Sequence, residues 1–219
     1  MVAFLDQRLW FPDPRCGRRD GLVAVGGDLS PERLLLAYRS GIFPWSAEPI
    51  TWWSPEPRAV FEIGALHIGR SLARTLRRRP YEVTCNRDFE GVIRACAEVP
   101  RGDTVSWITE EFIAAYTALA RAGHAHSVEC WRGPRLVGGI YGVSIGGFFA
   151  GESMFHTEDD ASKVALVHLE RRLAERGYRL FDTQMLTPTT RALGAREIPR
   201  AEYLERLKQA VEHPCRFDG

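Results

Sequence analysis

Apolar residues recur along this chain with two periods, and the change between them predicts where helices and strands lie. Helical spacing marks residues 66–79, a segment beginning after Asn86, and residues 109–123, 160–177 and 201–211. Apolar runs bounded by turn residues predict strands at 81–85, 124–131, 135–141, 147–151 and 178–184. The middle strands follow one another through short Gly-containing turns. The pattern therefore predicts an α/β or α+β protein, and it favours a mostly antiparallel central sheet.

The first part of the chain contains its own helix-boundary and turn residues. Ser30 suits a helix N-cap, Pro31 suits the first helical position, and Gly41 suits the stop of the same helix. Pro55 and Pro57 then predict an extended connector. We expect a small N-terminal domain over residues 1–58 and a catalytic domain over residues 59–219. The first is short, so we expect it to pack on the second rather than to fold alone.

Composition narrows the class of protein. The chain has 219 residues, is 45% hydrophobic and 26% charged, and has a net charge of +1, which is typical of a soluble globular protein. It has no apolar run near the roughly 20 residues that span a bilayer, and its start does not resemble a signal peptide. The five cysteines form no CxxC pair. These features predict a cytoplasmic protein that does not associate with a membrane.

Polar residues interrupt two of the predicted apolar strands. Glu152 and Ser153 follow the strand at 147–151, and a carboxylate at an apolar strand end is costly unless it is paired or used. In the strand at 178–184, side chains two apart share a face, which would align Asp182 with Gln184. Two such interruptions favour a site. The alternatives are that Asp182 caps the following turn and that Glu152 forms an ion pair with Lys163 or an arginine.

Basic and aromatic residues suggest a nucleic-acid substrate. A helix over 66–79 would place one group of arginines on a single face that suits phosphates: Arg70, Arg74, Arg77 and Arg78. Aromatic side chains near turns can stack nucleobases, and four tryptophans lie near such signals: Trp45, Trp52, Trp53 and Trp107. The arginines could instead form a solvated face. Core filling is the expected role of at least one of Trp52 and Trp53.

Several long motifs occur in an order that resembles one known family. They are GLVAVGGDLSPERLLLAYRSGIFPWS, WWSPEPRAVF, SWIT, GHAHSVE, GGIYGVSIGGFFAGESMF, ASK, DTQ and LGAREIPR. From about Phe11 to Leu207 the chain resembles leucyl/phenylalanyl-tRNA–protein transferases. The resemblance implies transfer of leucine or phenylalanine, with methionine a further candidate, from aminoacyl-tRNA to proteins with N-terminal Arg or Lys. It also implies that the added residue marks those proteins for degradation by the N-end rule pathway.

The resemblance also carries expectations for fold and site. It implies an acyl-CoA N-acyltransferase-like C-terminal domain and a monomer that uses no metal and no organic cofactor. Asp182 and Gln184 match the catalytic pair, and Glu152 the active-site pocket beside them. The other residues carried over as substrate-binding are Trp45, Trp107, Phe149, Ile140, Met154, Ser153 and Tyr38, and those carried over as tRNA-binding are Arg70, Arg74, Arg77 and Arg78.

These residues predict a mechanism of positioning. We expect Asp182 to orient Gln184 and help draw off a proton, while the Gln184 amide oxygen accepts a hydrogen bond from the attacking amine. Glu152 would hold the cationic substrate. Thr189 and Ala192 stand where relatives often have histidine and serine. The alternatives are an acyl-CoA N-acyltransferase and a catalytically silent tRNA-binding module.

Overall fold

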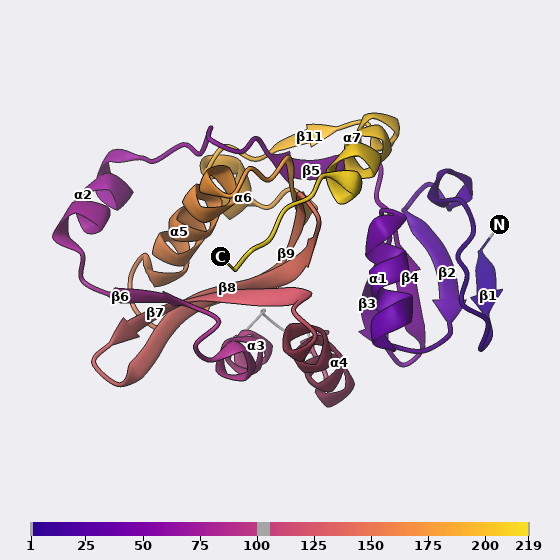
Figure 1. Ribbon diagram of the computed structural model, residues 1–219, viewed down its shortest axis with the longest axis horizontal. Coiled ribbons are helices and arrows are strands. Elements are labelled where there is room, and N and C mark those ends of the chain that lie inside the picture. The colour runs from indigo at the N-terminus through magenta and orange to yellow at the C-terminus, as the bar shows by residue number, and fades with distance from the viewer. Residues whose placement is uncertain (1, 100–105, 219) are drawn as a thin grey trace.

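The computed structural model describes residues 2–99 and 106–218 and contains two separate sheets (Figure 1). The smaller sheet has the strand order β1-β2-β4-β3. Its elements are β1 (Ala3–Leu5), the short 3-10 helix η1 (Pro14–Cys16), β2 (Leu22–Gly26), α1 (Pro31–Arg39), β3 (Phe43–Ala47) and β4 (Ile50–Trp53). The side chain of Ser30 accepts the Arg33 N–H, and Gly41 has a φ of +75°, so both helix-boundary predictions are confirmed.

The larger sheet follows the order β11-β5-β10-β9-β8-β7-β6. Its strands are β5 (Arg58–Phe61), β6 (Glu82–Cys85), β7 (Ala125–Arg132), β8 (Arg135–Ile145), β9 (Phe148–His156), β10 (Leu180–Gln184) and β11 (Arg196–Ile198). Each neighbouring pair is antiparallel except β9 and β10, which are parallel. The expected α+β class with a mostly antiparallel sheet is therefore confirmed.

Helices cover both faces of the larger sheet. The helices are α2 (Arg70–Arg78), α3 (Phe89–Glu98), α4 (Glu110–Arg121), α5 (Ala161–Glu175), α6 (Pro188–Ala192) and α7 (Arg200–Glu212). In Figure 1, α5 crosses one face while α3 and α4 cover the opposite face. Successive side chains of a strand point to opposite faces of the sheet. Ile140 and Phe149 therefore join the apolar cluster under α5, while Tyr141 and Phe148 join the cluster on the opposite face. None of the helices in the described ranges is long and apolar enough to cross a membrane.

Some local predictions are wrong in their boundaries, including the strand at 135–141, which continues as β8 to Ile145. Helix α2 begins at Arg70 rather than at residue 66. Helix α3 is capped by Asp88, because Asn86 lies in a left-handed turn and its side chain bonds Ser127 and Asp218 instead. Strand β9 runs on to His156, so Glu152 lies inside a strand and not at its end. Cross-strand pairing with β8 extends β9, and a local apolar pattern does not record that pairing.

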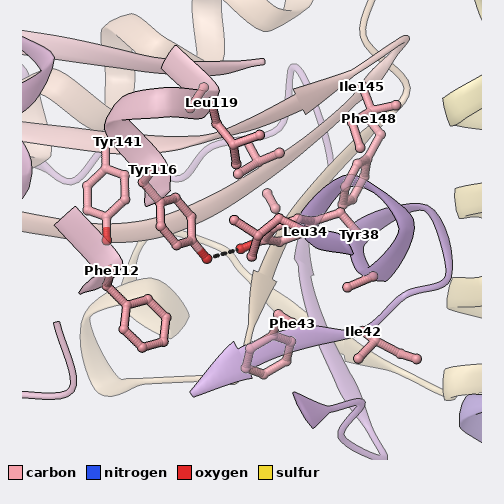
Figure 2. Packing of buried hydrophobic residues seen from close by; sticks show 14 of the residues in the cluster. Leu34, Tyr38, Ile42, Phe43, Phe112, Tyr116, Leu119, Tyr141, Ile145 and Phe148 are labelled. Carbon is pink, nitrogen blue, oxygen red and sulfur yellow. Dashed lines mark hydrogen bonds between the residues drawn. The ribbon is translucent and has the colours of Figure 1, made fainter. Parts of the chain in front are cut away.

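The two sheets meet at helix α1, which packs against α4 and α7. Figure 2 shows Tyr38 of α1 directed at Tyr116 of α4, with their hydroxyl oxygens 2.5 Å apart. Leu34 and Phe43 from the first part lie in the same apolar cluster as Phe148 from the second. The N-terminal part therefore shares a continuous core with the larger sheet.

Candidate active site

Glu152 and Gln184 meet between two neighbouring parallel strands. The register of β9 and β10 pairs Leu180 with Phe148 and Asp182 with Ala150, so the two strands run side by side as far as the residues just before Glu152 and Gln184. The Gln184 amide Nε2 donates to Glu152 Oε1 over 2.9 Å. The amide consequently presents its oxygen as an acceptor for a ligand's N–H. The structure thus brings together an amide and a carboxylate from the two polar interruptions identified in the sequence.

Gln184 departs from ordinary strand geometry. Its φ is +63°, and the pairing of β10 with β5 shifts by one residue between Asp182 and Gln184. Left-handed backbone is unfavourable for a residue with a Cβ, so surrounding contacts must maintain it. Asp182 Oδ1 provides one such contact, because it accepts a hydrogen bond from the Gln184 backbone N–H at 2.8 Å. The expected simple alternation along this strand is therefore wrong at Gln184, because a β-bulge re-aims its side chain.

Asp182 lies behind this pair and is fully buried. Arg58 donates two hydrogen bonds to the Asp182 carboxylate: Nε to Oδ1 at 2.9 Å and Nη2 to Oδ2 at 2.6 Å. The Tyr203 hydroxyl also donates to Oδ2, at 2.9 Å. Asp182 thus does cap the following turn, as the alternative proposed, by accepting the Gln184 backbone N–H. Its other hydrogen bonds come from Arg58 and Tyr203 in the protein interior. Asp182 orients Gln184 through its backbone N–H and is not turned toward the cavity.

Glu152 has a second partner on the other side. The Tyr116 hydroxyl donates to Glu152 Oε2 at 3.4 Å, and Tyr116 is in turn bonded to Tyr38. Removal of the carboxylate from water raises the pKa of Glu152 to about 7, while the nearby Tyr38 hydroxyl and the hydrogen bond from Gln184 act in the opposite direction. Lys163 bonds Asp160 instead, so the expected alternative of a Glu152–Lys163 ion pair is wrong. Glu152 is a carboxyl group that changes charge near neutral pH.

A cavity of about 340 Å³ opens beside Glu152. Its wall is mostly apolar and includes three residues carried over from the family: Ile140, Ser153 and Met154. A cavity of this kind with a few convergent polar groups suits an apolar side chain carrying a reactive end. Thr189, one of the departures from the family pattern, also lines it.

Phe149 and Tyr38 are both buried, and neither is among the described residues that line the cavity. Phe149 is 1% exposed and lies behind the cavity wall, with its ring 5.7 Å from that of Phe181 in a T-shaped contact. Phe181 itself lines the cavity. Tyr38 is also 1% exposed, and its hydroxyl meets that of Tyr116 (Figure 2), which in turn donates to Glu152. Each of the two therefore packs behind a residue that lines the cavity or contacts Glu152, and their assignment to substrate binding stays a prediction.

The tryptophans separate into two kinds. Trp52 is fully buried and donates to the Gly26 carbonyl, which confirms core filling for this residue. Trp45 is half-buried, with its ring 5.4 Å from that of Trp53. Trp107 is half-buried as well and packs edge-on against Phe112 at 5.3 Å. Trp45 and Trp107 thus keep aromatic surface that a nucleobase could contact.

Helix α2 carries the basic face expected from the sequence. All of the predicted arginines on it are exposed: Arg70, Arg74, Arg77 and Arg78. A hollow of about 790 Å³ lies between α2 and α5, and its lining includes Arg77, Arg79, His168 and Arg171. Burial lowers the pKa of His168, as do the neighbouring Arg171 and Arg79. Positive charge is concentrated there, as an anionic partner requires.

Sequence reasoning missed Arg58, Tyr116 and Tyr203. Arg58 opens β5, whose four residues are all buried, and this charge in an apolar run was a detectable signal. Its partner Asp182 lies 124 residues away. The two tyrosines resemble ordinary apolar positions of helices α4 and α7, and nothing in their local pattern indicates that their hydroxyls reach the carboxylates.

Comparisons with known proteins now bear on this geometry. The model of the leucyl/phenylalanyl-tRNA protein transferase family matches residues 60–208, and the model of its N-terminal domain matches residues 27–56. This chain belongs to that family. A transferase of the family from Anaeromyxobacter sp. (strain Fw109-5) is 55% identical over 96% of this chain and 91% of its own length. One from Nitratidesulfovibrio vulgaris (strain DP4) is 50% identical over 97% of this chain and 92% of its own length.

Likeness to solved structures is much weaker than likeness to family members. PaiA N-acetyltransferase from Thermoplasma acidophilum has a TM-score of 0.35 and 14% identity, over 44% of this chain and 75% of that one. L-PGS from Bacillus licheniformis has a TM-score of 0.40 and 14% identity, over 75% and 53%. Scores this low carry no argument, so the residues of this family member are interpreted from its own geometry.

Proposed function

We propose that this protein moves leucine or phenylalanine from aminoacyl-tRNA to the N-terminal Arg or Lys of an acceptor protein. Methionine is a further candidate donor. The observation that carries the proposal is the apolar cavity beside the Glu152–Gln184 pair, because it offers room for an uncharged side chain next to groups that can hold an amine. Family membership supports the same reaction.

The reaction is aminolysis of an ester. The α-amine nitrogen attacks the ester carbonyl carbon, a C–N bond forms, and the C–O bond to the terminal ribose breaks. The amine loses a proton and the ribose hydroxyl gains one, so the reaction is balanced without ATP. With a pKa of about 7.7–8.0, on the order of a tenth of such an amine is neutral at pH 7. Positioning the amine next to the ester therefore supplies a large part of the catalysis.

We assign Gln184 and Glu152 to the amine. The Gln184 amide oxygen accepts a hydrogen bond from the amine, and Glu152 attracts its positive charge and takes the proton as attack proceeds. A proton acceptor works best when its pKa lies near the operating pH, and that of Glu152 is raised to about 7 by burial. Asp182 is assigned the positioning of Gln184, because its own oxygens already accept from Arg58, Tyr203 and the backbone.

The tRNA would be held outside the cavity. Trp45 and Trp107 are proposed to stack on the 3′-terminal adenosine, since each keeps exposed ring surface. The arginines of α2 are proposed to contact phosphates of the acceptor stem. Ile140 and Met154 are proposed to contact the transferred side chain, because both line the cavity. We further propose a cytoplasmic monomer whose two domains divide at residue 58.

One experiment tests the function directly. Radiolabelled Leu-, Phe- and Met-tRNA are offered separately with an Arg-initiated peptide, and label in the peptide is measured. We expect transfer that requires the free N-terminus, so an N-acetylated copy of the peptide is the control. Label in neither peptide would contradict transferase function and favour a tRNA-binding module. Turnover of acyl-CoA in the absence of tRNA would favour an N-acyltransferase.

The site assignments require two variants. In a folded Asp182→Ala protein, transfer should fall much more than tRNA binding, because Gln184 loses its support while the α2 face is untouched. Equal losses in both would contradict that assignment. Glu152→Gln should reduce transfer and weaken binding of the acceptor peptide. If it changes neither peptide affinity nor transfer, Glu152 has no role in the reaction.

A further inference from the structure

Arg58 is a buried cation at the junction of the two sheets. It is the first residue of β5, is 1% exposed, and pairs with Asp182, which is fully buried. A third contact reaches the first part of the chain, where Arg58 Nη1 donates to the Gly41 carbonyl at 3.1 Å. Its guanidinium carbon also lies 4.9 Å from the ring centroid of Phe43 and 4.4 Å from that of Tyr203. Arg58 is therefore fixed on every side.

A buried ion pair is a weak means of stabilising a fold. Taking both charges out of water costs several kcal/mol per ion, and well-packed apolar residues often serve the fold equally well. Removing only one partner leaves an uncompensated charge and is strongly destabilising. The pair between Arg58 and Asp182 is thus better explained by what it orients than by net stability.

The atoms that Arg58 holds are those that determine where Gln184 points. Asp182 Oδ1 accepts both the Arg58 Nε–H and the backbone N–H of Gln184. The two-pronged grip fixes the plane of the carboxylate, because a guanidinium matches a carboxylate in only a few orientations. That plane sets the direction of the hydrogen bond that supports the left-handed backbone of Gln184. A rotated carboxylate would release this backbone and move its amide away from Glu152.

We propose that Arg58 is a positioning residue for the transfer reaction. Acting through Asp182, it holds the β10 bulge so that the Gln184 amide faces Glu152, and through Gly41 it links the N-terminal part of the chain to the reacting groups. This inference rests on the proposed function, and it deepens that function by naming a residue that never touches substrate. It predicts that replacing Arg58 slows the chemical step while substrate binding is retained.

The first test removes the paired hydrogen bonds of Arg58 to Asp182 but keeps the positive charge. Arg58→Lys cannot reproduce two parallel hydrogen bonds, so Gln184 should lose its orientation. A misplacement near 1 Å can reduce a rate by about 100-fold, and we expect kcat to fall by about that factor with the KM for peptide and the affinity for aminoacyl-tRNA nearly unchanged. Arg206→Lys is the matched control, because Arg206 makes a comparable two-pronged pair with Glu62, away from Gln184. It should leave kcat unchanged.

The outcomes separate this inference from the proposed function. If the wild-type protein transfers no amino acid, the proposed function fails before any variant is considered. If the wild type is active and folded Arg58→Lys keeps its kcat, Arg58 has no positioning role. If kcat falls equally in Arg58→Lys and Arg206→Lys, the loss reflects general destabilisation and the inference is overturned.

A second set of variants covers the case in which Arg58→Lys does not fold. Tyr203→Phe removes one donor to Asp182 but keeps the ring under the guanidinium, and we expect kcat to fall by about 10-fold in a folded protein. The double variant Arg58→Met with Asp182→Leu replaces the charges by apolar groups and should fold. It should remain inactive. A folded and fully active double variant, or an unaltered kcat in Tyr203→Phe, would show that the pair positions nothing.

Discussion

Replacing Glu152 with Gln is expected to stabilise the folded protein at alkaline pH while it impairs transfer. The pKa of Glu152 is raised from 4.5 to about 7, chiefly because burial removes its carboxylate from water. A carboxyl group with a raised pKa holds its proton in the folded state over a range in which the unfolded chain has lost it. The free energy of unfolding therefore decreases as pH rises from about 4.5 to about 7, and the decrease is complete above that range.

The magnitude follows from the size of the shift. Each pKa unit corresponds to about 1.4 kcal/mol, so a rise from 4.5 to about 7 corresponds to about 3 kcal/mol. Part of the Glu152 side chain faces the cavity, where water screens its charge, which reduces the expected figure to about 2 kcal/mol. Glutamine has nearly the same shape and no charge to desolvate. Its side-chain oxygen can still accept from Gln184, and Tyr116 can donate to Tyr38 in place of Glu152.

The assay is urea unfolding of wild type and Glu152→Gln at pH values from about 5 to about 9. We expect similar stabilities near pH 5, and above pH 7 a variant more stable by about 2 kcal/mol. Glu62→Gln is a control of opposite sign, because the Arg206 hydrogen bond lowers the pKa of Glu62. Its loss of stability should stay constant between about pH 5 and about pH 9, because a carboxyl group with a lowered pKa is charged throughout that range. A Glu152→Gln difference that is constant with pH would refute the reasoning.

Three other predictions follow from the structure. Changing Arg74 and Arg77 to Gln should reduce the slope of log affinity for tRNA against log salt by about 2, and an unchanged slope would indicate a solvated face. Ile140→Phe narrows the cavity and should lower kcat/KM for Phe-tRNA about 10-fold more than for Leu-tRNA; an unchanged ratio would exclude contact with the transferred side chain. Phe217 is buried and stacks on His126 with ring centroids 4.2 Å apart, so Phe217→Ala should cost about 3 kcal/mol of unfolding free energy in urea titrations. A cost below about 1 kcal/mol would mean that the C-terminal segment does not support the core.

Local signals were sufficient for the longer helices and most of the longer strands. Apolar periodicity located β7, β8, β10, α4, α5 and α7, because period and capping depend on residues within one or two turns. The small strands β1 to β4 and β11 were not anticipated, since three to five residues carry too little pattern to distinguish a strand from a loop. The polar interruptions at Glu152 and Asp182 were visible for the same local reason: each breaks an apolar run.

The sequence by itself determined the polar residues of β9 and β10 that lie at the candidate site, through the apolar runs that they interrupt and the family motifs that contain them. Only the tertiary structure decided what each does. Asp182 turned out to be a buried support because Arg58 reaches it from 124 residues away, and Gln184 faces Glu152 because a bulge reverses the expected alternation. Strand register and long-range pairing depend on the whole core, and no local window of sequence encodes them.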